Sequence, residues 1–413
     1  MRFLQCDSKW VSLRTQTHPS LPEKGGDEAH KKTVFVEAQN KFNTRNKMAI
    51  RVIISGGGTG GHIFPAVAIA NALKRIEANT EILFVGALGR MEMEKVPAAG
   101  YKIIGLDIQG FQRKSIWKNI LLPFKIVKSV LKSRFIIKNF KPNAVVGVGG
   151  FASGPLLYAA AQLGIPYLIQ EQNSYAGITN KKLGKNARKI CVAFEGMEKF
   201  FPADKIMLTG NPIRKESVNV IGRREEAALK LNLSPTKKTV LVTGGSLGAG
   251  TLNKSIIAGL DEFIKADVQL IWQTGKYYYQ DIKEKLAGKV HENIKVMEFL
   301  SDMDLAYAVA DVIISRAGAG TIAELCVIAK PVILVPSPNV AEDHQTKNAM
   351  ALVKNNAAII IKDTDAEAEL VTAALKLVLD EQHSQILSEN IKKLALPNAD
   401  EIIANEVIKI ANI

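Results

Sequence analysis

The stretch from residue 51 to residue 66 constrains the fold of this chain more than any other. It begins as a short β-branched apolar run, breaks into glycines at positions 56–58, 60 and 61, and continues as an alanine-rich helical pattern to about residue 76. This order of strand, tight turn and helix opens a βαβ unit. Glycines let the backbone approach a ligand closely, and the amides that begin a helix favour an anionic or strongly polar group. The stretch therefore predicts a ligand-binding turn.

The glycine spacing does not by itself identify the ligand. Gly56, Gly58 and Gly61 match the dinucleotide fingerprint, but a single match of this kind is weak. No Lys-Ser or Lys-Thr pair follows the glycines, so the turn is not a Walker loop. The next expected strand, 81–85, ends in Gly86 and Ala87, where a dinucleotide-binding protein would have an acidic residue for the ribose. The turn thus favours a Rossmann-like α/β fold without indicating a dinucleotide.

Strands and helices alternate along the rest of the chain, which predicts parallel sheets with helices on both faces. The alternation pauses around residues 210–214 and restarts at 240–249 with a second strand, glycine turn and helix. We expect two Rossmann-like domains, residues 48–212 and 213–395, with the ligand in a cleft between them. The expected strands are residues 50–55, 81–85, 101–106, 144–148, 166–170, 189–193, 240–243, 268–273, 294–298, 311–315, 331–335 and 357–361. In the first domain the expected helices are residues 63–77, 118–139, 154–163 and 175–184.

Length and composition agree with two globular domains and a polar extension. The chain has 413 residues, 47% of them hydrophobic, which is enough for two cores. Residues 1–47 are polar and lack a sustained period, so we expect a disordered extension and a fold that begins at Met48. The N-terminus lacks the apolar core of a signal peptide, and no uninterrupted apolar stretch is long enough to span a bilayer. Three widely separated cysteines suggest a reducing compartment and no disulfide framework.

A net charge of +14 indicates an anionic partner. Basic residues concentrate in residues 111–141, which contain no acidic residue and alternate with apolar and aromatic side chains. Such a segment is typical of a helix that lies on an anionic membrane. A core helix with a solvated lysine face explains the helical part equally well. Nucleic acid is disfavoured, because no recognised nucleic-acid motif accompanies the charge.

Several single residues are candidates for chemistry, each with an ordinary structural alternative. His62 ends the first glycine turn and could accept a proton from a hydroxyl, or could simply be structural. Asn173 follows an expected strand, where loop polarity is common. Arg214, at the boundary between the domains, could meet a phosphate or a base. Glu324 is expected in the first turn of a helix, where it could bind a ribose diol or only complement the helix dipole.

Residues 244–248 also match the G-x-S-x-G nucleophile elbow, with Ser246 as the nucleophile. An α/β-hydrolase is therefore an alternative, with Asp304 or Asp311 and His344 in the right chain order for a triad. That interpretation gives no role to the first glycine turn. Residues 342–348 combine acids with a histidine, but no second ligand cluster completes a metal site, so no metal or other cofactor is expected.

Taken together, six motifs resemble the MurG family, the bacterial N-acetylglucosaminyltransferases of peptidoglycan synthesis. Each motif is weak alone, but all six occur in register, and the resemblance covers essentially everything from Met48 onward. The motifs are residues 58–62, 171–173, 210–214, 244–249, 316–324 and 342–348.

The resemblance implies a GT-B fold, in which two Rossmann-like domains enclose a cleft and a last helix, 396–413, crosses back to the first domain. It implies inverting transfer of GlcNAc from UDP-GlcNAc to the 4-hydroxyl of MurNAc in lipid I, which gives lipid II. It further implies a peripheral position on the cytoplasmic face of the inner membrane, with residues 111–141 as the docking surface. Roles in cell shape and division, and contacts with other cell-wall synthesis proteins, belong to the same expectation.

The resemblance also implies a role for each matching residue. His62 is the leading candidate for the general base, and Thr59, Gly60 and Gly61 would lie near the sugar and the acceptor. The backbone of Leu300 would read the uracil. The remaining donor contacts would come from Asn173, Arg214, Ser246, Ala319, Gly320, Thr321, Ile322, Ala323, Glu324 and Gln345, with Glu324 on the ribose and Gln345 on the GlcNAc hydroxyls.

Departures from the family pattern and competing functions remain. Phe151 stands where some members have tyrosine, and His344 where some have a second glutamine. Another GT-B enzyme that uses UDP-GlcNAc, such as a glycolipid synthase or an epimerase, is the nearest alternative. A membrane-peripheral nucleotide-binding scaffold is the non-enzymatic one.

Overall fold

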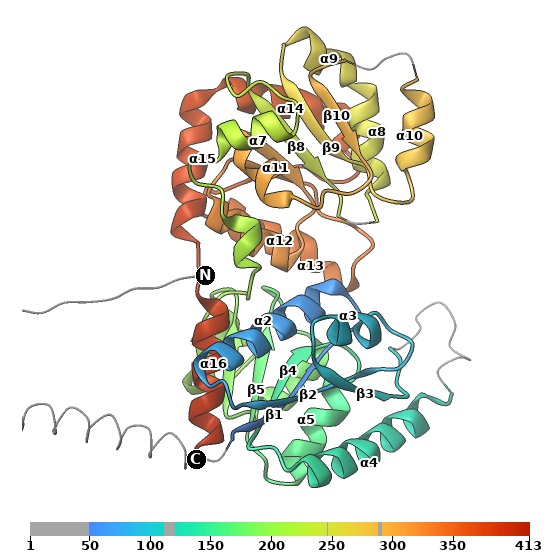
Figure 1. Ribbon diagram of the computed structural model, residues 1–413, viewed down its shortest axis with the longest axis vertical. Coiled ribbons are helices and arrows are strands. Elements are labelled where there is room, and N and C mark those ends of the chain that lie inside the picture. The colour runs from blue at the N-terminus through green and yellow to red at the C-terminus, as the bar shows by residue number, and fades with distance from the viewer. Residues whose placement is uncertain (1–48, 111–119, 246, 288–290) are drawn as a thin grey trace, which may run out of the picture. The chain divides into compact units, whose positions relative to one another are not determined.

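The first half of the folded chain is a parallel sheet covered by helices on both faces (Figure 1). The computed structural model describes residues 49–110, 120–245, 247–287 and 291–413, so the expected extension 1–47 lies outside the described residues. The seven strands run in the order β3-β2-β1-β4-β5-β6-β7. They are β1 (Arg51–Gly56), β2 (Glu81–Ala87), β3 (Lys102–Leu106), β4 (Ala144–Gly149), β5 (Tyr167–Glu171), β6 (Lys189–Val192) and β7 (Ile206–Leu208).

The helices of this half connect successive strands, as parallel pairing requires. They are α2 (Gly60–Ile76), α3 (Glu92–Ala98), α4 (Leu122–Phe140), α5 (Ser153–Gln162) and α6 (Ile178–Gly184). Five of the six residues of β1 are buried, because helices cover both faces of the sheet. Two segments were not expected from the sequence, the short helix α3 and the edge strand β7.

The second half repeats the architecture with six parallel strands in the order β10-β9-β8-β11-β12-β13. The strands are β8 (Thr239–Thr243), β9 (Gln269–Gln273), β10 (Ile294–Met297), β11 (Val312–Ser315), β12 (Val332–Leu334) and β13 (Ile359–Ile360). The helices are α7 (Arg224–Lys230), α8 (Gly250–Ala258), α9 (Leu260–Lys265), α10 (Tyr279–Lys285), α11 (Met303–Val309), α12 (Ala319–Ile328), α13 (His344–Val353), α14 (Ala366–Leu379) and α15 (Glu381–Lys393). The α/β class and the two Rossmann-like sheets are confirmed.

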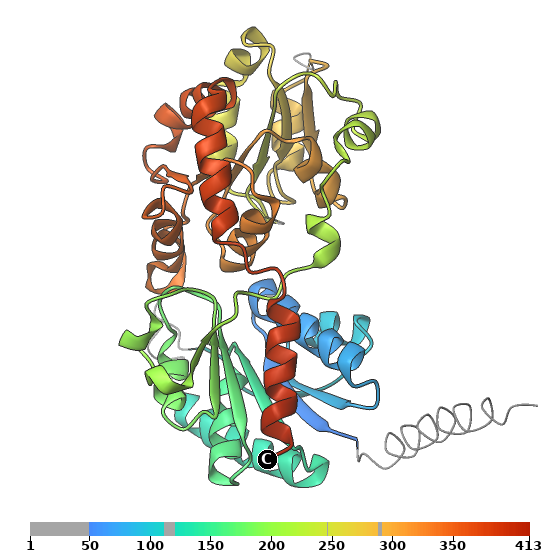
Figure 2. The ribbon, with the colours of Figure 1, turned by 90° about the vertical axis from the view of Figure 1, so that its left-hand side faces the viewer.

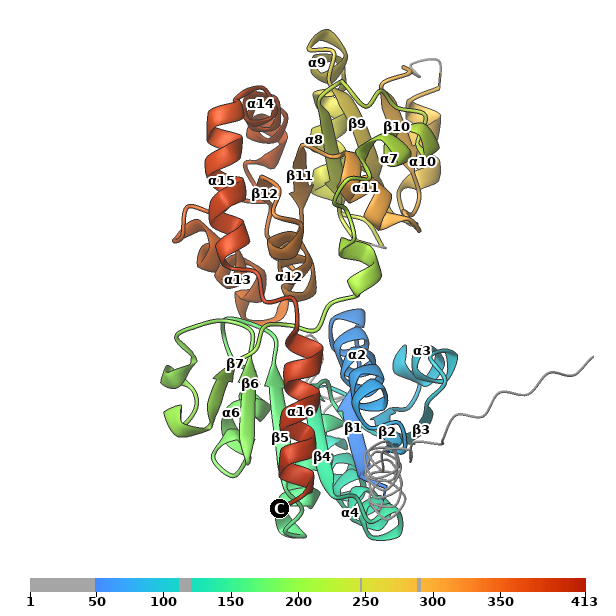
Figure 3. The ribbon, with the colours of Figure 1, turned by 60° about the vertical axis from the view of Figure 1, so that its left-hand side comes forward.

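The last helix, α16 (Ala399–Ala411), packs against α2 and β4 of the first half. Figures 2 and 3 show it lying beside the first sheet. Its buried residues Ile403, Val407 and Ile410 join the core cluster that also contains Ile54 and Leu73. At its start, the Arg75 Nη2 atom lies 2.6 Å from Asp400 Oδ2. Residues 50–413 form one compact unit as a result.

Candidate active site

Two glycine turns of the first half lie against each other at the carboxyl ends of β1 and β4. The amide of Gly57 donates a hydrogen bond to the Gly149 carbonyl, at 3.3 Å. Gly58 and Gly150 have φ angles of +88° and +90°, in the region that favours glycine. A Cβ atom on Gly150 would lie 2.4 Å from the Gly57 carbonyl oxygen. Any larger side chain at position 150 would therefore push the two turns apart.

His62 lies between these turns, at the third residue of α2. Its ring packs on Gly149, where an added Cβ would lie 2.4 Å from the His62 Cδ2 atom. The Thr59 hydroxyl lies 3.4 Å from the His62 Nδ1 atom. Burial lowers the pKa of His62 below its usual value, while the Glu92 carboxylate and the Gly57 carbonyl raise it and His344 lowers it further. The imidazole is therefore neutral at pH 7, the state in which it can accept a proton.

A buried carboxylate beneath the first turn was missed in the sequence. Glu92, the first residue of α3, is only 1% exposed. Its two oxygens accept hydrogen bonds from the backbone amides of Gly58, at 2.8 Å, and Ala87, at 3.0 Å. The only sequence signal is an acidic residue between the expected strands 81–85 and 101–106.

Glu324 and Arg214 come together beside the start of α2. The Arg214 Nη2 atom lies 3.7 Å from Glu324 Oε1, and the Tyr307 hydroxyl donates to Glu324 Oε2 at 3.4 Å. Burial raises the pKa of Glu324 above its usual value, and Arg214 opposes this shift. The Arg214 guanidinium also lies 5.6 Å from the centroid of the Phe64 ring on α2. This brings a residue of the domain boundary, a residue of α12 and the start of α2 into one site.

The position of Glu324 corrects one expectation. We expected Glu324 in the first turn of its helix, but α12 begins at Ala319 after Gly318, which places Glu324 in the second turn. Glu324 is thus poorly placed to complement the helix dipole, whose effect falls off within the first turn. The alternative in which Glu324 only complements the helix dipole therefore loses its support.

Amide side chains link the two halves beside the site. Asn348 on α13 donates to the Asn173 Oδ1 atom at 3.2 Å and accepts from the Ser174 amide at 3.0 Å. Asn211 donates to the carbonyls of Gln172, at 3.0 Å, and Ala319, at 3.2 Å. Both bridges join the strand ends of the first sheet to helices of the second half. The first bridge holds Asn173 against α13, and the second holds Asn211 against the start of α12.

The remaining expected residues lie around the second sheet. Gln345, at the start of α13, accepts a hydrogen bond from the Ser337 amide at 2.8 Å. Leu300 is buried in the core of the second half. Ser246 lies outside the described residues. The first turns of α12 contain Ala319, Gly320, Thr321, Ile322, Ala323 and Glu324.

A cavity of ≈720 Å³ opens behind α12 and is lined from both halves. Its wall includes Ala319, Ile322 and Ala323 of α12, together with Asn211 and Lys347. The size is that of a pocket for a small organic ligand. Within the described residues, no three His, Cys, Asp or Glu side chains are grouped as metal ligands would be.

The residues proposed for a hydrolase triad are engaged elsewhere. The Asp304 carboxylate is 2.6 Å from the Arg223 Nη1 atom, and both oxygens of Asp311 accept hydrogen bonds from Arg224 at 3.0 Å. His344 instead lies 3.9 Å from a Glu342 oxygen. Neither aspartate is therefore available to orient His344, as a triad would need.

Comparison with known proteins agrees with this geometry. Residues 52–192 match the N-terminal domain of glycosyltransferase family 28 and residues 239–405 its C-terminal domain. The chain is 57% identical over 377 residues to the UDP-N-acetylglucosamine–N-acetylmuramyl-(pentapeptide) pyrophosphoryl-undecaprenol N-acetylglucosamine transferase of Bacteroides fragilis, covering 90% of this chain and 99% of that protein.

Solved structures are similar over the same span. MurG of Acinetobacter baumannii is 29% identical, with a TM-score of 0.71, and the match covers 87% of this chain and 99% of that one. A UDP-GlcNAc 2-epimerase from Neisseria meningitidis, bound to UDP-GlcNAc, is 15% identical with a TM-score of 0.59, over 88% of this chain and 100% of that one. The epimerase shares the fold alone.

Proposed function

The chain belongs to glycosyltransferase family 28, and from this membership we propose that it moves GlcNAc from UDP-GlcNAc to the MurNAc 4-hydroxyl of lipid I, giving lipid II. The observation that carries the proposal is the end-to-end similarity to a transferase of that activity, at 57% identity. The neutral His62 between two glycine turns, opposite Arg214 and Glu324, supplies the chemistry that such a transfer needs.

In the proposed reaction His62 takes the proton of the acceptor hydroxyl as its oxygen attacks the anomeric carbon of GlcNAc. The bond from that carbon to the UDP oxygen breaks on the opposite face, so the α configuration becomes β without a covalent enzyme intermediate. The amides at the start of α12 face the negative charge that develops on the leaving diphosphate. Arg214 adds a positive charge beside them.

The proposed division of labour follows the two sheets. Residues 48–212, together with 396–413, would bind the acceptor, with Thr59, Gly60 and Gly61 near the reacting sugars. Residues 213–395 would bind the donor, with Glu324 on the ribose, Gln345 on the GlcNAc hydroxyls and the Leu300 backbone on the uracil. Asn173 reaches the donor from the first half, next to its hydrogen bond with Asn348.

The test is UDP release from UDP-GlcNAc with and without a soluble lipid I analogue. We expect release only with the acceptor, and a β-linked disaccharide as the product. Release without acceptor, or conversion of UDP-GlcNAc to its 2-epimer, would instead identify a hydrolase or an epimerase. UDP binding without any turnover would leave a nucleotide-binding scaffold.

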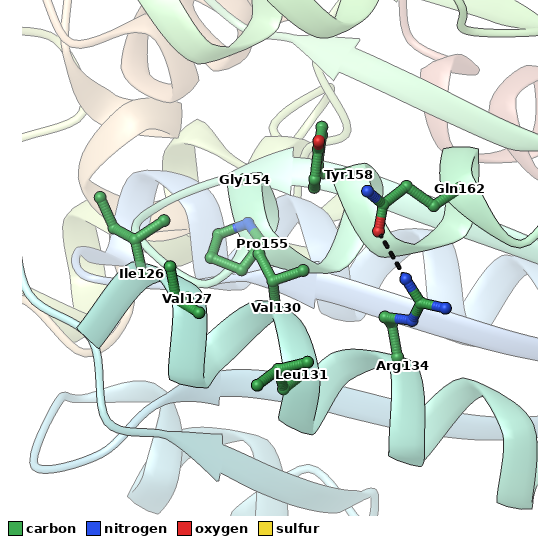
Figure 4. A pocket seen from close by; sticks show the side chains of 9 residues that line it. All are labelled: Ile126, Val127, Val130, Leu131, Arg134, Gly154, Pro155, Tyr158 and Gln162. Atoms are coloured by element: carbon green, nitrogen blue, oxygen red, sulfur yellow. Dashed lines mark hydrogen bonds between the residues drawn. The ribbon is translucent and has the colours of Figure 1, made fainter. Parts of the chain in front are cut away.

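We further propose that α4 docks the protein on the cytoplasmic face of the membrane. Phe124, Leu131 and Phe135 on α4 are each more than 60% exposed. An apolar groove of ≈440 Å³ runs between α4 and α5 (Figure 4). Val127, Val130 and Leu131 form one wall, Pro155 and Tyr158 the other, and Arg134 donates to Gln162 at one end.

The charge of α4 fits an anionic surface. The helix carries Lys125, Lys128, Lys132, Arg134 and Lys138 and no acidic residue. Two interactions bind peripheral helices to a membrane. Apolar side chains enter the interface, and cationic side chains face the anionic headgroups. The expected docking surface includes residues 111–119, which lie outside the described residues. No helix in the described part of the chain is long and apolar enough to cross a bilayer.

Replacing Phe124, Leu131 and Phe135 together by serine is expected to weaken binding to anionic vesicles at least about tenfold. Three large apolar side chains would no longer leave water on docking, at about 1.5–3 kcal/mol each when fully buried. Co-sedimentation with phosphatidylglycerol vesicles measures the effect. Ile221→Ser is the matched control, because Ile221 is 93% exposed in the second half. Equal binding by the triple variant and the control would refute the docking proposal.

A further inference from the structure

Glu92 is a buried acidic side chain held by backbone amides. It lies beneath the first glycine turn, with one oxygen on the Gly58 amide at 2.8 Å and the other on the Ala87 amide at 3.0 Å. In the described part of the chain no lysine or arginine forms an ion pair with it. Carboxylates are rarely buried to this extent without a cation. A role beyond packing would explain a carboxylate in such a place.

Two glycines make room for this carboxylate. A Cβ atom on Gly57 would lie 2.2 Å from Glu92 Oε1, and one on Gly86 would lie 2.6 Å from Glu92 Cγ. Both contacts are far shorter than real Cβ atoms allow. Glycine at positions 57 and 86 therefore leaves the space that the Glu92 side chain occupies. The turn that carries His62 is built on top of the carboxylate.

Few groups act electrostatically on His62. Glu92 on α3 faces it from below and raises its pKa, while His344 on α13 faces it from the second half and lowers it. The Gly57 carbonyl also favours the protonated ring, and burial opposes protonation most strongly. Glu92 is consequently the negative side chain that balances the charge His62 would gain on accepting a proton.

We propose that Glu92 is a positioning residue for His62: it fixes the first glycine turn through the Gly58 amide and stabilises the imidazolium formed when the acceptor hydroxyl loses its proton. The inference rests on the proposed function, in which His62 is the base. No atom of Glu92 touches the substrate in this role. The carboxylate acts at short range through the backbone that it holds and through its charge.

The test begins with Glu92→Gln, which keeps the shape and removes the charge. We expect kcat to fall about tenfold to a hundredfold, with UDP affinity within threefold of the parent. Without the carboxylate the pKa of His62 falls further, so the acid limb of the profile of kcat/KM against pH moves to lower pH. Glu92→Asp keeps the charge and should leave the limb in place while lowering kcat. Glu94→Gln is the control, because Glu94 is exposed on the same helix and pairs with Lys95.

A double variant separates this inference from the proposed function. If Glu92 acts through His62, adding Glu92→Gln to His62→Ala causes no further loss of turnover. Two results would show a merely structural role and overturn the inference. In the first, Glu92→Gln lowers turnover by the same factor in His62→Ala as in the parent. In the second, the acid limb stays in place in Glu92→Gln. If His62→Ala alone keeps full activity, the assignment of the base fails instead. Circular dichroism and UDP binding establish that each variant is folded.

Discussion

Replacing His62 by alanine is expected to lower kcat for acceptor-dependent UDP release by about 10²–10⁴-fold, the usual contribution of a general base. UDP affinity should change little, because the donor contacts that we propose come mainly from the second half. The ring lies on Gly149, between two turns that hold each other in place. The bond between the turns joins backbone atoms only, so His62→Ala removes the proton acceptor and keeps that bond.

The pH profile distinguishes this role from a structural one. Burial lowers the pKa of His62 below its usual value, and the base works in its deprotonated form. Activity should be complete above this lowered pKa and should fall as the pH drops through it. In His62→Ala that acid limb should disappear. His383→Ala, on α15 of the second half, serves as the control. A variant at position 62 that loses affinity for UDP as much as it loses turnover would contradict the assignment.

Replacing Glu324 by alanine is expected to weaken UDP binding about 10- to 100-fold. Hydrogen bonds to a charged group contribute about 1.5–3 kcal/mol, and the ribose hydroxyls would lose such a partner. The change also leaves the Tyr307 hydroxyl and the Arg214 guanidinium without the carboxylate they contact. Isothermal titration with UDP measures the loss, and Glu389→Ala, an exposed position on α15, is the control.

The pH dependence of UDP binding follows from the same carboxylate. Burial raises the pKa of Glu324, and ionised Glu324 is the stronger acceptor for ribose hydroxyls. Binding should be strongest above this raised pKa and should weaken as the pH falls through it. In Glu324→Ala that dependence should vanish. Unchanged UDP affinity in Glu324→Ala would rule out the ribose contact. The contact would also be ruled out if replacing UDP by 2′,3′-dideoxy-UDP weakened binding by the same factor in the parent and in Glu324→Ala.

The strands and their parallel arrangement could be predicted because most of them are buried on both faces. Residues 52–54 and 240–242 are continuous apolar runs, which are typical of buried strands in a parallel sheet. Each run is followed by glycines and then by a helical pattern. The short segments were harder. Helix α3 spans seven residues and contains Pro97, so it has no amphipathic repeat. Strand β7 is three residues long at a sheet edge.

The site was predictable only where the chain is locally continuous. His62 and Glu324 became candidates because each belongs to a strand-turn-helix motif, and Thr59 because of the family resemblance. Glu92 was not, because its meaning depends on an amide 34 residues away. The bridges from Asn348 to Ser174 and from Asn211 to Ala319 span 174 and 108 residues. Such pairs arise from packing of the two halves, which no local pattern encodes.

The position of α16 has a consequence for how the protein is made. The ribosome synthesises residues 399–411 after the whole second half, yet their side chains complete the core around α2 and β1. The half that is translated first therefore lacks part of its core until the half translated second has emerged. Co-translational folding of this chain cannot proceed strictly domain by domain, in contrast to the usual order. For the same reason, a chimaera that exchanges the donor half with a relative has to keep its own C-terminal helix with the first half.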